Sequence, residues 1–260
     1  MPRKHLYIPD TQAREGVSFE HLHWVGKLIV DEKPDVIVHA GDHFDMPSLS
    51  SYDKGKVVAE GRRLHKDFEA GHEAMNVLLY PMMSYNLRRT ENRKKRYTPE
   101  MYFTLGNHEE RLNRHIEAHA ELEGFLQFPQ SFNLEAYGWV VVPFLQPITI
   151  DGIAYAHYFY NPNTGKPYGG ACLTKLKNIG TSFVQGHVQG LDMTNRTTNV
   201  GETQWGIQAG SCYLHDEGYK GPQANAHWRG VLIFDEVEDG NFDPRPISLA
   251  RLEKMYGKPY

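Results

Sequence analysis

The sequence predicts an α/β fold whose short buried strands end in polar side chains. The run Val36–Val38 is apolar and β-branched, which is typical of a strand buried on both faces. Gly41 ends this strand, and two carboxylates follow it, Asp42 and Asp45. Four other short apolar segments end in the same way, at Asp10, Asn107, His157 and His187. Open α/β sheets bind ligands at the carboxyl edge of their strands, so these side chains converge if the strands are neighbours.

The N-terminal part of the chain predicts a β-α-β unit. Leu6–Ile8 is the first strand, and Ser18 is a suitable N-cap for a helix that runs to about Asp31. An apolar stripe supports this helix, formed by Leu22, Val25 and Ile29. Pro34 ends the helix before the next strand, so the two strands should be parallel and joined by a right-handed crossover.

Residues 47–97 predict a helical and basic insertion beside the site. The spacing of apolar residues favours a helix from Lys56 to Leu79 that Pro81 ends. The stretch from 82 to 97 has no clear periodicity and holds six basic residues, Arg88, Arg89, Arg93, Lys94, Lys95 and Arg96. Such a cluster is usually a solvated face or a mobile loop. The alternative is a patch that contacts phosphate near the active edge.

The rest of the chain predicts further strands and two more helices. A helix from Glu109 to about Glu121 would point its N-terminus at the site, and a short helix would run through Leu173 and Leu176. An Asp-Gly turn predicts a hairpin over residues 147–158. Further strands are expected at 139–142, 182–185, 205–208, 213–214, 231–234 and 247–249, with a long polar loop at 215–229. Both halves carry candidate ligands, so we expect a single domain, 1–260, built from two sheets.

The composition fits a globular protein without a membrane segment. The 260 residues carry a net charge of −4, and 40% of them are hydrophobic, with no apolar run of transmembrane length. The first strand begins too early for a signal peptide. Cys172 and Cys212 lack the paired spacing of a zinc site, so we expect free thiols in a reducing cytoplasm. The negative net charge argues against a surface that binds nucleic acid everywhere.

The converging side chains predict a metal centre. Buried carboxylates repel one another unless they are protonated or neutralised by a metal ion. Two histidines and an asparagine beside them make a metal the simplest explanation. A carboxylate that bridges two cations about 3.5–4 Å apart is used in phosphoester hydrolysis, where the ions orient the phosphate and lower the pKa of a shared water. The pattern therefore indicates metal-dependent attack of hydroxide on a phosphate ester.

These motifs, in this order, resemble those of the calcineurin-like metallophosphoesterases. That family carries Asp-x-His, Gly-Asp-x-x-Asp, Gly-Asn-His-Asp/Glu, a lone His after a strand, and Gly-His-x-His. The matching segments here are Asp10-Thr-Gln12, Gly41-Asp42-His-Phe-Asp45, Gly106-Asn107-His108-Glu109, His157 and Gly186-His187-Val-Gln189. The resemblance spans residues 6–211, and the insertion and C-terminal tail are similar to phage and prophage members of unassigned role. It implies an αββα sandwich of two facing mixed sheets flanked by helices, and a host cytoplasm if the chain is phage-encoded.

The resemblance implies a role for each matching residue. Asp42 would bridge two metals, Asp10 would belong to site 1, and site 2 would be completed by Asn107, His157 and His187. His108 would act as general acid toward the leaving-group oxygen, oriented by Asp45, and Asn107 and His108 would also face the substrate.

Gln12 and Gln189 stand where the family has histidines, and both belong to site 1. Site 1 would then hold oxygen ligands only, from Asp10, Gln12, Asp42 and Gln189, which suits Mg²⁺, Mn²⁺ or Ca²⁺ better than Zn²⁺. Site 2 keeps two imidazoles and can hold Mn²⁺, Zn²⁺, Fe²⁺ or Ni²⁺. We expect two divalent ions, with Mn²⁺ as the preferred metal, and we expect site 1 to bind its ion more weakly than site 2. One alternative is a one-metal centre whose glutamines donate N–H groups to the phosphate. The other is a catalytically inactive protein.

The substrate is a phosphate ester whose identity the sequence leaves open. His43, Arg111 and His215 are further candidates for binding it, as are His227 and Arg229 in the long loop. Met46-Pro47 replaces the Arg-Gly of the family's protein phosphatases, and too few residues follow the last motif for the extra domain of its nucleases. A phosphomonoester or phosphodiester remains, as a small phosphodiester, a nucleotide or a nucleic-acid end. A DNA exo- or endonuclease and a weakened, metal-stabilised binding module are the alternatives, and the oligomeric state is not indicated.

Overall fold

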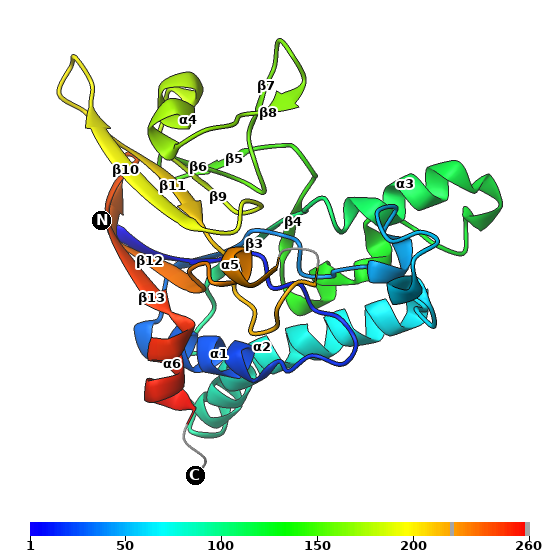
Figure 1. The fold of residues 1–260 in the computed structure, drawn as a ribbon. Helices are drawn as coiled ribbons and strands as arrows, with labels where there is room; N and C mark the ends of the chain where they lie inside the picture. The colour runs from blue at the N-terminus through cyan, green and yellow to red at the C-terminus, as the bar shows by residue number, and fades with distance from the viewer. Residues whose placement is uncertain (219–220, 258–260) are drawn as a thin grey trace.

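The computed structural model describes residues 1–218 and 221–257 and contains two large mixed sheets (Figure 1). The first has the strand order β13-β12-β1-β2-β3-β4. Its parallel strands are β1 (Arg3–Ile8), β2 (Val36–His39), β3 (Glu100–Thr104) and β4 (Val140–Val142). β12 (Gly230–Glu238) runs antiparallel to β1, and β13 (Asn241–Ser248) runs antiparallel to β12.

The second sheet has the order β10-β11-β9-β6-β5. Its parallel centre is formed by β6 (Ile153–Ala156), β9 (Phe183–Gln185) and β11 (Thr203–Ala209). Its antiparallel edges are β5 (Ile148–Ile150) and β10 (Leu191–Thr197). The predicted β5–β6 hairpin is confirmed, and both turn residues have positive φ, 48° at Asp151 and 83° at Gly152. β7 (Tyr160–Asn161) and β8 (Lys166–Pro167) form a separate small hairpin.

Alternation of side chains along the strands builds three apolar layers. Tyr7 packs between the two sheets, in one cluster with Val38, Tyr155 and Val184, whereas its neighbours Leu6 and Ile8 face helices. The outer face of the first sheet is covered by α1 (Glu20–Glu32), α2 (Leu64–Glu91) and α6 (Leu249–Tyr256). α4 (Cys172–Ile179) covers the second. The predicted αββα sandwich is confirmed.

Helix α2 differs from its prediction at both ends. It begins at Leu64 and passes through Pro81 to end at Glu91. A Cβ on Gly26 would lie 2.8 Å from the Pro81 Cδ and 2.3 Å from the Leu78 carbonyl oxygen, so α1 packs directly on α2 at the proline. This packing stabilises the helix where its own sequence would break it. No helix in the described part of the chain is long and apolar enough to cross a membrane.

Several smaller boundaries also differ. The expected strand at 213–214 is absent, and the strand expected at 247–249 is β13, whose Pro244 and Pro246 are tolerated because β13 is an edge strand. α3 (Glu110–Ala118) is shorter than expected, and α5 (Gly221–Asn225) lies in the predicted loop. The short 3₁₀ segments are η1 (Pro47–Leu49), η2 (Val57–Ala59), η3 (Ala120–Leu122), η4 (Gln130–Phe132) and η5 (Leu134–Tyr137).

The basic residues near 88–96 do not lie beside the candidate site. Arg89, Lys95 and Arg96 line a cavity together with Asp35 and Glu100, which stand at the amino ends of β2 and β3. The candidate ligands follow the opposite, carboxyl ends. The prediction of a basic insertion beside the site is therefore wrong for its basic part. The 28-residue α2 is roughly 40 Å long and carries these residues to the far edge of the sheet.

Candidate metal centre

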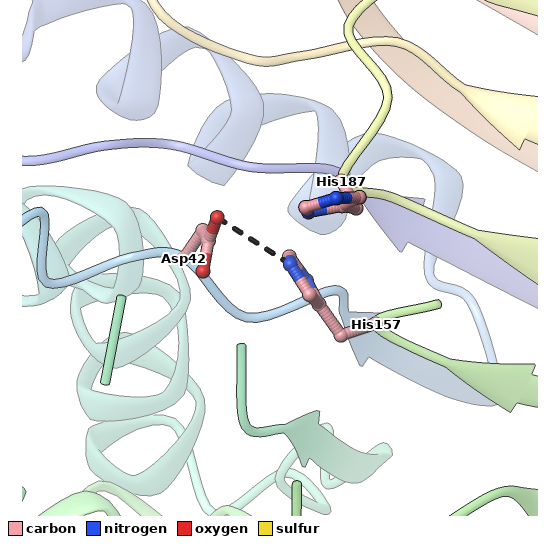
Figure 2. A group of neighbouring side chains, drawn as sticks. All are labelled: Asp42, His157 and His187. Atoms are coloured by element: carbon pink, nitrogen blue, oxygen red, sulfur yellow. Dashed lines mark ion pairs between the residues drawn. The ribbon is translucent and has the colours of Figure 1, made fainter. Parts of the chain in front are cut away.

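The carboxyl ends of five strands bring the predicted ligands together. Asp10, Asp42 and Asn107 follow β1, β2 and β3 of the first sheet, and His157 and His187 follow β6 and β9 of the second. The donor atoms of Asp42, His157 and His187 all lie within 4.8 Å of one another, and the three side chains surround one space in Figure 2. The His157 Nε2 lies 3.4 Å from an Asp42 carboxylate oxygen and 3.0 Å from the Asn107 amide oxygen.

The turns that present these ligands have an unusual backbone. Gln12, Asp42 and His187 have φ values of 42°, 47° and 63°, in the left-handed region that costs a non-glycine residue about 1–2 kcal/mol. Close packing also requires glycine before two of the ligands. A Cβ on Gly106 would lie 2.2 Å from an Asp42 carboxylate oxygen, and one on Gly186 would lie 2.3 Å from an Asp10 carboxylate oxygen. The Gly-Asn and Gly-His pairs therefore follow from the tight packing around the two carboxylates.

Glu109 holds two of these turns in register. Its Oε1 accepts the backbone N–H groups of His43 and Phe44 at 2.7 and 2.9 Å, and its Oε2 accepts those of Asp42 and Gly106 at 2.9 Å each. The carboxyl group is fully buried. Burial and the neighbouring Asp42 raise the pKa of Glu109, and the N–H donors oppose this shift. Sequence reasoning placed Glu109 in a motif without a role, because its partners are backbone groups.

The donor groups fit a divalent cation. The Asp10 Oδ2 and the Gln12 Oε1 are buried and have no hydrogen-bond partner within the described chain. The His157 Nδ1 lies 2.7 Å from the Ala40 carbonyl oxygen and so carries a proton, which leaves Nε2 as the ring nitrogen that faces the other ligands. Such a cluster of acceptors needs a cation at its centre.

The pKa values describe the same local excess of negative charge. Burial alone would lower the pKa of His157, but Asp42 and Asp10 raise it to about 9. Burial raises the pKa of Asp10 to about 7, against the opposing effect of His157. Burial and His157 lower the pKa of His187 to about 4, which keeps that ring neutral and able to ligate. Protons occupy positions that a bound metal would take.

Gln189 has a partner in the structure. Its Oε1 accepts the hydroxyl of Tyr213 at 2.7 Å. An amide oxygen has two lone pairs, so this bond leaves one pair for a metal. The assignment of Gln189 and Gln12 as site 1 ligands stays a prediction.

His108 and Asp45 form the expected pair beside the metal ligands. The His108 Nδ1 lies 2.8 Å from an Asp45 carboxylate oxygen, and its Nε2 lies 3.6 Å from an Asp42 oxygen. The His108 backbone N–H also donates to Asp42 at 2.8 Å. Burial opposes the shift, but the two carboxylates raise the pKa of His108, which favours the protonated ring.

Two further residues join this pair, and sequence reasoning did not find them. The Arg14 guanidinium lies 3.3 Å from Asp45 and 3.0 Å from Glu217, and Glu217 in turn contacts the His215 Nε2 at 3.0 Å. His215 therefore reaches the site through Glu217. Arg111 donates to the Asp45 backbone carbonyl at 2.7 Å, which fixes the loop after the carboxylate. The one available signal was that Arg14 follows the first motif closely.

His43 does not face the substrate space, which corrects the prediction for it. Its ring is fully buried. The Nδ1 lies 2.7 Å from the Thr11 hydroxyl, and the Nε2 lies 2.9 Å from the Gly71 carbonyl oxygen on α2. Both ring nitrogens thus have protein partners, and His43 fastens the metal-binding turns to the helix beneath them.

The two remaining loop candidates lie close to this edge. His227 helps to line a cavity that opens beside His187, and its Nε2 lies 2.7 Å from the Ser211 hydroxyl. Arg229 donates to the Leu214 carbonyl at 2.7 Å and pairs with Asp216 at 2.8 Å. Arg229 therefore ties the loop together.

Comparisons with known proteins agree with this site. The family model for calcineurin-like phosphoesterases matches residues 5–236. The Gene 54 proteins of Mycobacterium phages D29 and L5 are 23% and 22% identical to this chain, over 96% of it and 95% of each relative. The similarity to phage-encoded proteins is thereby confirmed. The chain belongs to the calcineurin-like phosphoesterase family and is a metal-dependent phosphoesterase.

Proposed function

We propose that the protein hydrolyses a phosphodiester bond in a nucleotide or at a nucleic-acid end. The observation that carries this proposal is a cavity of about 570 Å³ beside His187. Among the described residues, neither lysine nor arginine lines it; its walls include Val188, Ala224 and Ala226. A neutral, partly apolar cavity of this size suits the organic group of an ester rather than a second phosphate.

The cations near the metal centre support a diester over a monoester. Arg14 is engaged by Asp45 and Glu217, Arg111 by the Asp45 carbonyl, and Arg114 donates to the Asn107 carbonyl at 3.2 Å. A terminal phosphate carries more negative charge than a diester and would need such a group free to bind it. Since these guanidinium groups hold protein acceptors, a singly charged diester suits the site better.

Two divalent ions would occupy this edge of the sheets, with Mn²⁺ as the preferred metal. Site 2 would be held by Asp42, Asn107, His157 and His187, and site 1 by Asp10, Gln12, Asp42 and Gln189. When bound, such ions activate a water and polarise the phosphate. Oxygen ligands alone bind more weakly than a set with imidazoles, so site 1 would be the weaker.

His108 would give its proton to the leaving-group oxygen. Asp45 fixes the ring through Nδ1, so Nε2 faces the space shared with Asp42. The two carboxylates raise the pKa of His108 and so favour the protonated ring, as a general acid requires. The phage relatives also lead us to propose the host cytoplasm as the place of action.

The test compares bis-p-nitrophenyl phosphate with p-nitrophenyl phosphate in Mn²⁺. We expect a higher kcat/KM for the diester and a kcat that falls about 10²–10⁴-fold in His108→Ala. Metal content should not change, because His108 is outside the ligand sets. His65→Ala is the matched control, since His65 is exposed on α2. A preference for the monoester would refute the substrate proposal, and an unchanged kcat in His108→Ala would refute the acid role. No hydrolysis with any divalent ion would favour the binding-module alternative.

A further inference from the structure

A second charged surface lies at the opposite edge of the first sheet from the metal centre. A cavity of about 520 Å³ there is lined by five cationic side chains. Arg3 is paired with Glu100 and Asp151, and we call the other four, Lys33, Arg89, Lys95 and Arg96, the basic surface. They come from the end of α1, from α2 and from the segment that leads into β3. The four residues of β2 and the turn after it separate this surface from Asp42 by roughly 20 Å.

The positive charges of the basic surface are not neutralised by the protein. Glu100 pairs with Arg3 at 2.7 Å, and Asp35 accepts the Lys4 backbone N–H at 2.8 Å, so the nearby acids are already engaged. Lys33 and Arg89 lie over the Tyr85 ring, each 5.5 Å from its centroid. Within residues 1–218 and 221–257, no carboxylate forms an ion pair with any of the four. The surface therefore suits an anion from outside.

Hydrogen bonds hold the segment that carries these charges in place. The Asn86 side chain donates to the Tyr97 carbonyl and accepts its N–H, both at 2.8 Å. The Tyr97 hydroxyl donates to the Pro34 carbonyl at 2.6 Å, and the Arg89 Nε donates to the Lys95 carbonyl. Asn86 is itself buried. These bonds fix the backbone of the segment at both of its ends, while the Lys95 and Arg96 side chains are exposed to solvent.

We propose that the basic surface binds the phosphodiester backbone of a nucleic-acid strand. The proposal rests on the proposed function, because the same strand would supply the bond that the metal centre cleaves. Several like charges in one cavity call for a ligand with repeated negative charges, and a backbone carries one phosphate for each nucleotide. Contacts of this kind hold a strand without reading its sequence. The chain as a whole carries a net charge of −4, so the excess of cations is a local feature of this surface.

The test measures binding of a fluorescent, cleavage-resistant phosphorothioate 20-mer by anisotropy in Mn²⁺ over a series of salt concentrations. The variant Lys33→Gln/Lys95→Gln/Arg96→Gln spares Arg89, which holds the segment. Each lost contact removes about 0.7 from the slope of log K against log salt, so the slope should fall by about 2. Affinity at 100 mM salt should fall on the order of tenfold or more.

The control carries the same charge change elsewhere, as Lys54→Gln/Lys166→Gln/Lys177→Gln, three exposed residues. It should keep the wild-type slope. An equal slope in the two variants would overturn the proposal. It would also be overturned if these cations were needed for binding anionic lipid vesicles but not for binding the 20-mer. Hydrolysis of bis-p-nitrophenyl phosphate should be unaffected in both. If the wild type fails to hydrolyse that diester, the proposed function fails, and the slopes still decide the role of the basic surface.

Discussion

Replacing Glu109 by Gln should unfold the metal-binding turns without removing a single ligand. The carboxylate accepts two backbone N–H groups on each oxygen. An amide has only one oxygen, so either His43 and Phe44 or Asp42 and Gly106 would face an NH₂ group that cannot accept. Two buried donors would lose their partners, at about 1–3 kcal/mol each. We expect the free energy of unfolding to fall by about 2–6 kcal/mol, which is a large part of the total stability of a typical domain.

The assay is urea unfolding followed by fluorescence, together with the metal content after dialysis. The matched control is Glu110→Gln, because this neighbouring side chain accepts a single bond, from the Asn113 amide at 2.8 Å, and an amide oxygen can still accept it. The control should stay within about 0.5 kcal/mol of the wild type. A Glu109→Gln variant as stable as the control would refute the role given to these hydrogen bonds.

Three other experiments test the site and an ion pair outside it. Arg14→Gln leaves the buried Glu217 without its cation, so the free energy of unfolding should fall by about 3 kcal/mol. The double variant Arg14→Gln/Glu217→Gln should recover part of this loss. No recovery in a double-mutant cycle would exclude an energetic coupling between Arg14 and Glu217. After dialysis without chelator, elemental analysis should find one metal equivalent, with tighter binding at pH 8 than at pH 6 because metal displaces the proton of His157; two retained equivalents would contradict the weak site. The pair with Arg245 lowers the pKa of Glu32 from its ordinary 4.5 to about 2, so its stabilisation is present above pH 4.5 and lost as the pH falls toward 2. The deficit of Glu32→Gln in urea unfolding should therefore be on the order of 1 kcal/mol at pH 6 and shrink by pH 2.5, and a constant deficit would argue against it.

The strand ends could be predicted because each is encoded locally. A short apolar strand, a glycine and a polar residue stand within a few positions of one another at Asp42, and the same holds at Asn107 and His187. The order of these motifs also identified the family. Arg14 and Glu217 could not be found in this way, because 203 residues separate them and only the fold brings them together.

The errors have the opposite cause, since there a local signal was overridden by packing. Pro81 marks a helix end in the sequence, yet α1 packs against it at Gly26 and the helix continues, which moved the basic residues to the far edge. His43 and His108 each follow a ligand directly, and the sequence does not distinguish them. The left-handed turn at Asp42 directs His43 into the core beside Gly71, while His108 remains beside Asp45.

The two glutamines do not form the contacts that fix the proposed acid–base pair, although both parts of the site share Asp42. His108 is fixed by Asp45 and by the backbone contact to Asp42, and neither involves Gln12 or Gln189. On the proposed ligand sets, the two glutamines would alter only how strongly a cation is held next to Asp10. The proposed weaker cation site, beside a proposed general acid whose contacts are unchanged, is therefore more consistent with altered metal use than with lost catalysis.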